Sequence, residues 1–331
     1  MTVTPLLISF FAIAVFFGFL NGFHDSANIV SAAITSRALP PRTALLLAAA
    51  AVLAGPFLFG VAVAKTVGAD LLDPTALDLL VVLSGLSAAV VWNIVTWYLG
   101  IPSSSSHALI GGLLGAAVLT GGLEVIRSPG LIKVLLALFL SPALGLLAGF
   151  FLLRLTLFLL RGASPGVNRL LRRGQVLALV GLGLSHGTND GQKTMAVLTL
   201  GLVTVGWLDE FTVPLWVIAV SGLAMALGTS LGGWRLIRTL GGRIFRIRPA
   251  HGFVSQIAGA SVILGAAFAG GPVSTTQVMS SAIMGTGAGQ RMSQVRWQVL
   301  REMLTAWILT IPITAALAGL IHALLISLGV N

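Results

Sequence analysis

The stretch Gly22-Phe23-His24-Asp25-Ser26-Ala27-Asn28 places an acid inside a predominantly apolar run from residue 6 to residue 39. A carboxylate at that depth in a membrane is costly unless another group pairs with it. A second acid, Asp190, lies in a similar setting within residues 185–194. We therefore expect two copies of one structural plan, each built around one of these acids.

The composition indicates a membrane protein. Of the 331 residues, 56% are hydrophobic and 8% are charged, whereas soluble domains carry about 25% charged residues. Apolar stretches long enough to cross a bilayer as helices recur along the whole chain. The run at 6–20 lacks a preceding basic region and a cleavage site, so we expect it to belong to the first span rather than to a signal peptide. These features predict an all-α polytopic membrane protein.

The formal net charge of +10 has a topological explanation. The arginines lie in short loops between apolar spans, as the positive-inside rule produces. We therefore expect the lipid bilayer as a partner and no nucleic acid. The sequence contains no cysteine, which excludes disulfides and thiolate metal sites.

The apolar spans of the two halves follow the same order. A long span at about 3–39 carries Asp25 and exceeds one straight crossing, so we expect a broken helix there, and another at 175–205 around Asp190. Shorter spans follow at about 43–64, 79–99, 108–120 and 131–160, and at 213–233, 254–269, 278–289 and 306–328. The predicted units are a first repeat at 1–160, a basic cytoplasmic linker at 161–174 and a second repeat at 175–331.

Each half also contains a hydroxyl-rich turn after an apolar helix. The turns are Pro102-Ser103-Ser104-Ser105-Ser106-His107 and Pro272-Val273-Ser274-Thr275-Thr276-Gln277. Aligned on their prolines, they place hydroxyl on hydroxyl at three successive positions. Non-helical backbone at membrane depth is tolerated only where it is buried in protein or lines a cavity. We therefore predict two re-entrant helical hairpins with their tips inside the membrane.

The loop charges predict the orientation. If each long span crosses once and each hairpin returns to its own side, 14 of the 19 lysines and arginines fall on one side: Arg37, Arg42, Arg161, Arg169, Arg172, Arg173, Arg235, Arg238, Arg243, Arg246, Arg248, Arg291, Arg296 and Arg301. The loops with Asp70, Asp73, Asp78, Glu124, Asp209 and Glu210 fall on the other. The basic side should be cytoplasmic, which places both termini outside the cell inner (plasma) membrane. Because matching loops of the two halves differ in charge, we predict inverted-topology repeats, which in transporters enclose a midplane site.

The hairpin tips and broken helices predict the substrate. Helix N-termini and hydroxyl groups are hydrogen-bond donors that suit a tetrahedral oxyanion. A co-bound cation or proton would offset the two carboxylates, and this coupling would drive symport. An ionised carboxylate also accepts a hydrogen bond from a protonated phosphate, whereas sulfate at neutral pH has no proton to donate. The acids therefore favour phosphate over sulfate.

The sequence resembles the PiT family of inorganic phosphate transporters along nearly its whole length. The matching segments are GFHDSAN (22–28), WNIVTWYLGIPSSSSHALIGG (92–112), SHGTNDGQKTM (185–195) and VRWQVLREMLTAWILTIP (295–312). The resemblance implies a homodimeric, inverted-repeat secondary transporter that imports phosphate with Na⁺ or H⁺ and is not an enzyme. His24 stands where many members have Asn, and this difference favours protons as the coupling ion. Gln277 stands where His is frequent. The coupling ion stays open.

The predicted substrate site takes residues from both repeats. Its members are Asp25, Asn28, Ser103, Ser104, Ser105, Ser106, Thr188, Asn189, Asp190, Gln192, Lys193, Ser274, Thr275 and Thr276. Four of them are also predicted to bind the coupling cation: Asp25, Asn28, Asn189 and Asp190. Apart from Na⁺ we expect no metal, and we expect no cofactor.

Several alternatives stay open. Each acid could brace helices only, and Lys193 could neutralise Asp190 or contact the anion. A permease for sulfate or another oxyanion would use the same fold. A serine hydrolase built on His107 and its neighbouring serines would need reactive atoms that adjacent residues rarely align. A passive channel is a further alternative, although paired acids and two occluding tips favour alternating access.

Overall fold

The computed structural model describes residues 4–73, 76–101, 103–234, 237 and 247–330. Within these ranges the regular structure is helical, with an isolated bridge between Leu72 and Ile126. In chain order the elements are α1 (Pro5–Thr35), α2 (Pro41–Phe59), α3 (Ala62–Lys65), the π-helical turn η1 (Thr66–Asp70), α4 (Leu79–Leu99), α5 (Ser105–Gly121), the 3-10 turn η3 (Leu123–Val125), α6 (Ser128–Leu159), α7 (Val167–His186), the π-helical turn η4 (Gly187–Gly191), α8 (Gln192–Thr204), α9 (Leu215–Leu231), α11 (Pro249–Phe268), α12 (Thr275–Gln290), the 3-10 turn η5 (Met292–Gln294) and α13 (Trp297–Ser327).

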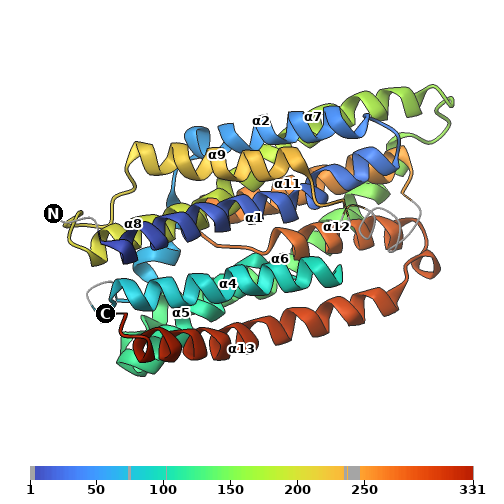
Figure 1. The fold of residues 1–331 in the computed structure, drawn as a ribbon. Helices are drawn as coiled ribbons and strands as arrows, with labels where there is room; N and C mark the ends of the chain where they lie inside the picture. Colours follow the sequence, from blue (N-terminus) through green and yellow to red (C-terminus); the bar gives the residue numbers. More distant parts are fainter. Residues whose placement is uncertain (1–3, 74–75, 102, 235–236, 238–246, 331) are drawn as a thin grey trace.

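The long helices lie along one common direction, and most of the connections lie at the two ends of the bundle (Figure 1). Six of the described helices are long and apolar enough to cross a membrane: α1, α2, α4, α6, α11 and α13. Together with the family assignment below, they make this chain a multi-pass membrane protein. The predicted span at 79–99 is confirmed by α4 at the same residues. Its ends have local causes, because the Asp78 carboxylate caps the Val81 amide and Gly100 stops the helix at a φ of 71°.

Helix caps move several boundaries away from the sequence predictions. The Ser104 and Ser274 hydroxyls cap α5 and α12, so both helices begin three residues earlier than the predicted spans at 108 and 278. For α7 and α13 the predicted start was the first residue of the apolar stretch, and the polar residues that precede this stretch were left out of the helix. As a result α7 already begins at Val167, inside the predicted linker, and α13 begins at Trp297 rather than near residue 306.

The prediction of a broken helix around Asp25 is wrong, because α1 runs without interruption from Pro5 to Thr35. Gly22, one of the signals for a break, serves close packing instead, since a Cβ there would clash with the Met225 carbonyl of α9. The polar side chains are accommodated by local bonds, such as that from the Ser26 hydroxyl to the Phe23 carbonyl at 2.8 Å. Around Asp190 the helix is interrupted, but by the single π-helical turn η4 rather than by unwound chain.

The two ends of the bundle differ in charge. The connections α1–α2, α6–α7 and α12–α13 lie at the end away from the two termini (Figure 1), and they carry Arg37, Arg161 and Arg291. The connection α8–α9, which carries Asp209 and Glu210, lies at the end where the described chain begins and finishes. Most of the predicted basic loop before α11, with Arg235, Arg238, Arg243 and Arg246, lies outside the described residues.

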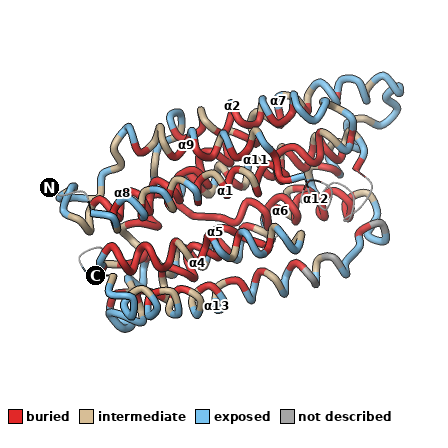
Figure 2. Tube along the Cα trace, in the orientation of Figure 1, coloured by how far each residue is buried: buried red, intermediate tan, exposed pale blue. Residues whose placement is uncertain are grey.

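Burial is greatest in the middle of the bundle (Figure 2). In α8 the residues from Gln192 to Leu202 are buried, as is α12 from Thr275 to Gly289. In contrast, α6 exposes large apolar side chains such as Phe139 and Phe151. Exposed apolar side chains on a membrane-spanning helix suit contact with lipid. The polar residues of the predicted site therefore lie in the buried interior, and the exposed apolar side chains of α6 lie on the outer surface of the bundle.

Candidate substrate and cation site

The two membrane acids meet in the buried interior. Asp25 belongs to α1 and Asp190 to η4, and the fold brings their carboxyl groups close enough to interact electrostatically. Neither residue is more than 2% exposed. One oxygen of each carboxyl group, Oδ2, has no hydrogen-bond partner among the described residues. Two acids that are 165 residues apart in the sequence thus form one buried pair with unfilled acceptor capacity.

On the Asp25 side, neutral donors bind the carboxyl group. The Asn28 amide donates to Asp25 Oδ1 at 2.7 Å and to the Thr276 hydroxyl at 3.0 Å. The Thr276 hydroxyl in turn donates to Asp25 Oδ1 at 3.4 Å. Because α1 is continuous, Asp25 and Asn28 lie one turn apart on the same face. These bonds join the middle of α1 to the first turn of α12.

On the Asp190 side, a buried lysine binds the carboxyl group. Lys193, one turn further along at the start of α8, forms an ion pair with Asp190 Oδ1 and is 1% exposed. Its ammonium group also donates to the Ser106 hydroxyl and, at 3.1 Å, to the Val273 carbonyl. The Ser106 hydroxyl donates to the same carbonyl at 2.8 Å. Lys193 therefore ties together η4, the first turn of α5 and the segment that precedes α12.

Asn189 holds the extended segment before α12. Its amide nitrogen donates to the Gly271 carbonyl at 3.0 Å, and its amide oxygen accepts from the Val273 N–H at 3.3 Å. The side chain thus pairs with backbone as a neighbouring strand would, which satisfies polar groups that are buried away from water. In this arrangement Asn189 positions the extended segment that precedes α12.

The two hydroxyl-rich turns have matching roles. Ser104 Oγ accepts from the His107 N–H at 3.2 Å, and Ser274 Oγ accepts from the Gln277 N–H at 3.4 Å. The aligned side chains of His107 and Gln277 meet directly, with their Nε2 atoms 3.4 Å apart. The first turns of α5 and α12 therefore lie side by side. Ser105 and Thr275 are the first residues of these helices and are buried there.

Three predicted site residues make their bonds elsewhere. The Ser103 hydroxyl donates to Thr96 Oγ1 at 2.8 Å, within its own half. The Thr188 hydroxyl returns to the Leu184 carbonyl of its own helix at 2.7 Å. Both ends of the Gln192 amide bind the turn around α3, donating to the Gly60 carbonyl at 2.6 Å and accepting from the Ala64 N–H at 2.9 Å. These bonds brace the surroundings of the acid pair rather than the pair itself.

His107 contacts one of its neighbouring serines, Ser104. His107 Nδ1 lies 2.7 Å from Ser104 Oγ, three residues earlier, whereas the hydroxyl of the adjacent Ser106 donates to the Val273 carbonyl. The contact has a structural cause, because Ser104 is the residue that caps α5 and His107 lies in the first turn above it.

Two polar residues near the acids, Asn21 and His186, were not predicted as site residues from the sequence. The Asn21 amide donates to the Asp190 backbone carbonyl at 3.3 Å, and His186 interacts electrostatically with Asp190. Each is a polar residue within an apolar span, four positions before a motif acid, and this is a sequence signal that could have identified them. His24, by contrast, lies near the backbone of Asn93 on α4.

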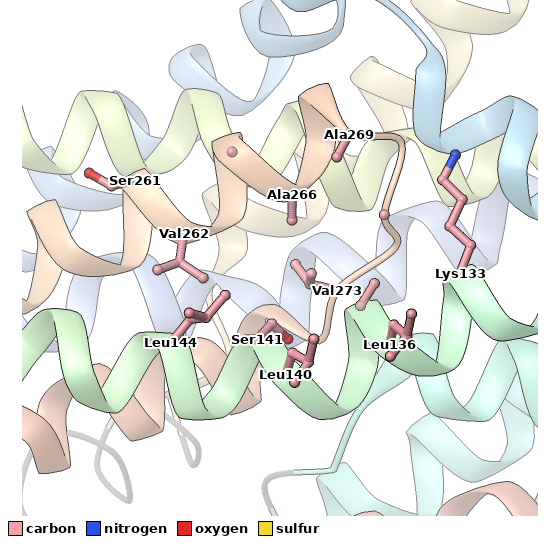
Figure 3. Close-up of a pocket in the computed structure, with 13 residues that line it drawn as sticks. Lys133, Leu136, Leu140, Ser141, Leu144, Ser261, Val262, Ala266, Ala269 and Val273 are labelled. Atoms are coloured by element: carbon pink, nitrogen blue, oxygen red, sulfur yellow. The ribbon is translucent and has the colours of Figure 1, made fainter.

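The site is closed in this conformation. Every predicted substrate residue is at most 9% exposed. A cavity of about 450 Å³ lies between α6 and α11, behind the extended segment that ends at Val273 (Figure 3). Its lining is mostly apolar, with Lys133 at one end, and includes neither acid. Within the described residues, no group of three or more His, Asp or Glu side chains is arranged to hold a metal ion.

Comparisons with known proteins now decide the family. A profile described as the phosphate transporter family matches residues 21–318. The chain belongs to the phosphate transporter family. A probable low-affinity inorganic phosphate transporter of Bacillus subtilis (strain 168) is 41% identical over 98% of this chain and 97% of that protein. One of Rhizobium meliloti (strain 1021), with the same description, is 40% identical over 96% of each chain.

Membership in the phosphate transporter family confirms the resemblance noted in the sequence. The family and these relatives are transporters and not enzymes, which removes the hydrolase hypothesis. A solved structure described as the sodium-dependent phosphate transporter has a TM-score of 0.87, covering 98% of this chain and 100% of that one. At 22% sequence identity this likeness shows a shared fold.

Proposed function

We propose that this chain is a secondary active symporter that imports inorganic phosphate with H⁺ or Na⁺ by alternating access. The observation that carries the proposal is the buried junction where an acid from each half meets two hydroxyl-rich helix starts. Its relatives are described as inorganic phosphate transporters, and the solved structure of the same fold as sodium-dependent. Both descriptions support phosphate as the substrate, and that of the solved structure also supports a cation as its partner.

The charges of the junction support cation coupling. If Asp25 and Asp190 are both ionised, Lys193 offsets one of the two negative charges and leaves the other buried. An uncompensated charge in a buried site is costly, and an incoming phosphate anion adds to it. A proton or sodium ion entering with phosphate would remove this cost. We therefore assign the coupling cation to the Asp25–Asp190 pair, with Asn28 and Asn189 as neighbouring ligands.

The hairpin tips supply donors for the anion. α5 and α12 both begin at the junction, and the free N–H groups at a helix start attract anions. Ser103, Ser104, Ser105 and Ser106 on one side and Ser274, Thr275 and Thr276 on the other surround these starts with hydroxyl groups. We propose that phosphate binds between the two tips when the site opens.

Matching elements support two inverted repeats at 1–160 and 175–331 with re-entrant hairpins. The starts of α4 and α11 are 170 residues apart, as are those of α5 and α12 and the internal prolines Pro142 and Pro312. The helix contacts also correspond between the halves: α5 of the first half packs on α13 of the second, and α12 of the second half packs on α6 of the first. This exchange is what two inverted repeats around a shared site would produce.

The charge difference between the ends supports the orientation. With the arginine-rich end in the cytoplasm, the two termini lie outside a plasma (inner) membrane. We also propose a homodimer on the basis of the family resemblance.

Uptake of labelled phosphate into proteoliposomes tests the function. Sodium and pH gradients are imposed separately, with excess sulfate as competitor. We expect uptake driven by one of the gradients and insensitive to sulfate, which would also name the coupling ion. Counterflow without a channel-like conductance would separate a carrier from a channel. Absence of phosphate uptake under both gradients would overturn the proposal.

A further inference from the structure

The surroundings of the Lys193 ammonium group are those of a bound cation. Three oxygen atoms of different kinds surround it: a carboxylate oxygen of Asp190, the hydroxyl of Ser106 and the carbonyl of Val273. They come from three separate segments, which meet only in the folded protein. Transporter sites for Na⁺ are built from such oxygen atoms beside helix ends and extended backbone.

An ammonium group has three N–H donors, and these three oxygen atoms use all of them. At 1% exposure Lys193 is also among the largest fully buried side chains of the protein. Since its donors are occupied, Lys193 has none left for phosphate in this conformation. The sequence left two roles open for Lys193, neutralising Asp190 or binding the anion. The geometry favours the first.

We infer that Lys193 is a tethered cation that occupies the place of an alkali-metal ion beside Asp190 and so sets the number of sodium ions the site can take. The inference rests on the proposed function, as it concerns the same site. Because the charge is covalently attached, it cannot dissociate with the substrate. Only the Asp25 half, whose partners Asn28 and Thr276 are neutral, is then left to take a cation from solution.

The test compares Lys193→Ala, which vacates the position, with Lys193→Arg, which keeps the charge. Lys133→Ala is the matched control. Like Lys193, this lysine donates to a hydroxyl group, that of Thr66 at 2.9 Å, but it lies away from the acids. Thermal unfolding is measured without phosphate, in sodium chloride and in choline chloride at equal ionic strength. This readout does not depend on transport, so it tests the inference even if phosphate is not the substrate.

We expect Na⁺ to raise the unfolding midpoint of Lys193→Ala by at least about 2 °C more than that of the wild type, since a ligand that binds only the folded state stabilises it. The arginine variant and the Lys133→Ala control should respond as the wild type does. Equal shifts in Lys193→Ala and the wild type would overturn the inference and leave Lys193 as a structural brace for Asp190.

Phosphate uptake provides the second readout. The ratio of uptake in sodium to uptake in choline should be at least about tenfold higher for Lys193→Ala than for the wild type. In this variant the buried Asp190 carboxylate has lost the lysine, and Na⁺ would restore a cationic partner. An unchanged ratio would contradict the inference. If neither variant of Lys193 folds, Asp25→Asn provides the test with the lysine intact. Its unfolding midpoint should not respond to Na⁺, and a remaining response would show a second free sodium site.

Discussion

At the residue scale, the two acids occupy corresponding positions of the two halves but have different partners. Asp25 is bonded by the neutral side chains of Asn28 and Thr276, whereas Asp190 is paired with the ammonium group of Lys193. A neutral partner leaves a carboxylate able to take a cation, and a permanent cation does not. The two acids therefore differ in the charge of their surroundings, and also in their backbone, since Asp25 lies in the continuous helix α1 and Asp190 in the π-helical turn η4.

Replacing Asp25 with Asn removes the proposed cation ligand while keeping the side-chain shape. We expect phosphate uptake to fall by at least about tenfold, and the concentration of driving cation needed for half-maximal uptake to rise, because one charge contact of 1.4 kcal/mol or more is lost. The control is Asp78→Asn, since Asn also caps helices and Asp78 only caps α4. Unchanged cation dependence in Asp25→Asn would contradict the cation assignment.

Replacing Asp190 with Asn should affect stability as well as transport. It leaves the Lys193 ammonium buried without its counter-ion, and breaking a buried ion pair costs about 3–5 kcal/mol. Asp25→Asn leaves no such charge behind, so its unfolding midpoint should fall less. The double variant Asp190→Asn, Lys193→Gln should recover part of the loss in a thermal unfolding measurement. If the double variant is no more stable than Asp190→Asn alone, the two side chains do not depend on each other.

At the element scale, the segment before α12, which the sequence predicts to be a hairpin tip, has an open space behind it. The cavity between α6 and α11 borders Gly271 and Val273, which are the residues that Asn189 holds (Figure 3). If this tip moves during the proposed transport cycle, the cavity can accommodate the movement. α6 and α11 would then act as the wall against which the tip moves.

Filling this cavity should slow transport without unfolding the protein. Gly265 lines the cavity, and a Cβ added there meets nothing within 4 Å. Gly265→Leu should therefore fold, and we expect its initial phosphate uptake rate to fall several-fold. Gly181 is an equally open helical glycine away from the cavity, so Gly181→Leu is the matched control. Equal rates in the two variants at equal unfolding midpoints would show that the tip does not use this space.

At the scale of the whole molecule, charge separates the two ends of the bundle. The connections that carry Arg161 and Arg291 lie opposite the end that carries Asp209 and both termini (Figure 1). Positive charge is retained on the cytoplasmic side during insertion. The end with the termini should therefore face outward.

Single cysteines test this orientation without background, because the chain contains none. We expect Asp209→Cys to react with a membrane-impermeant thiol reagent in intact cells. Arg169→Cys, which replaces an exposed residue of the opposite end, should react only after the membrane is permeabilised. The reverse labelling pattern would place the termini in the cytoplasm.

The sequence alone determined the helical membrane class, the order of the spans and the residues of the acid pair, because apolar length and isolated intramembrane charges are local signals. α4 was predicted to the residue, and the caps at Ser104 and Ser274 explain the earlier starts of α5 and α12. Glycine was the ambiguous signal. It permits both a break and a close helix contact, and the packing of Gly22 on α9 favoured the contact.

The tertiary structure alone decided which partner each polar side chain takes. Nothing local to Lys193 predicts that Ser106 and Val273 complete its coordination, or that Gln192 binds the turn around α3 instead of the site. These partners lie 80 or more residues away along the chain. In a medium without water, a buried donor or acceptor can be satisfied only by a group that the fold brings near. That choice depends on how all the helices pack together, and therefore on the whole chain.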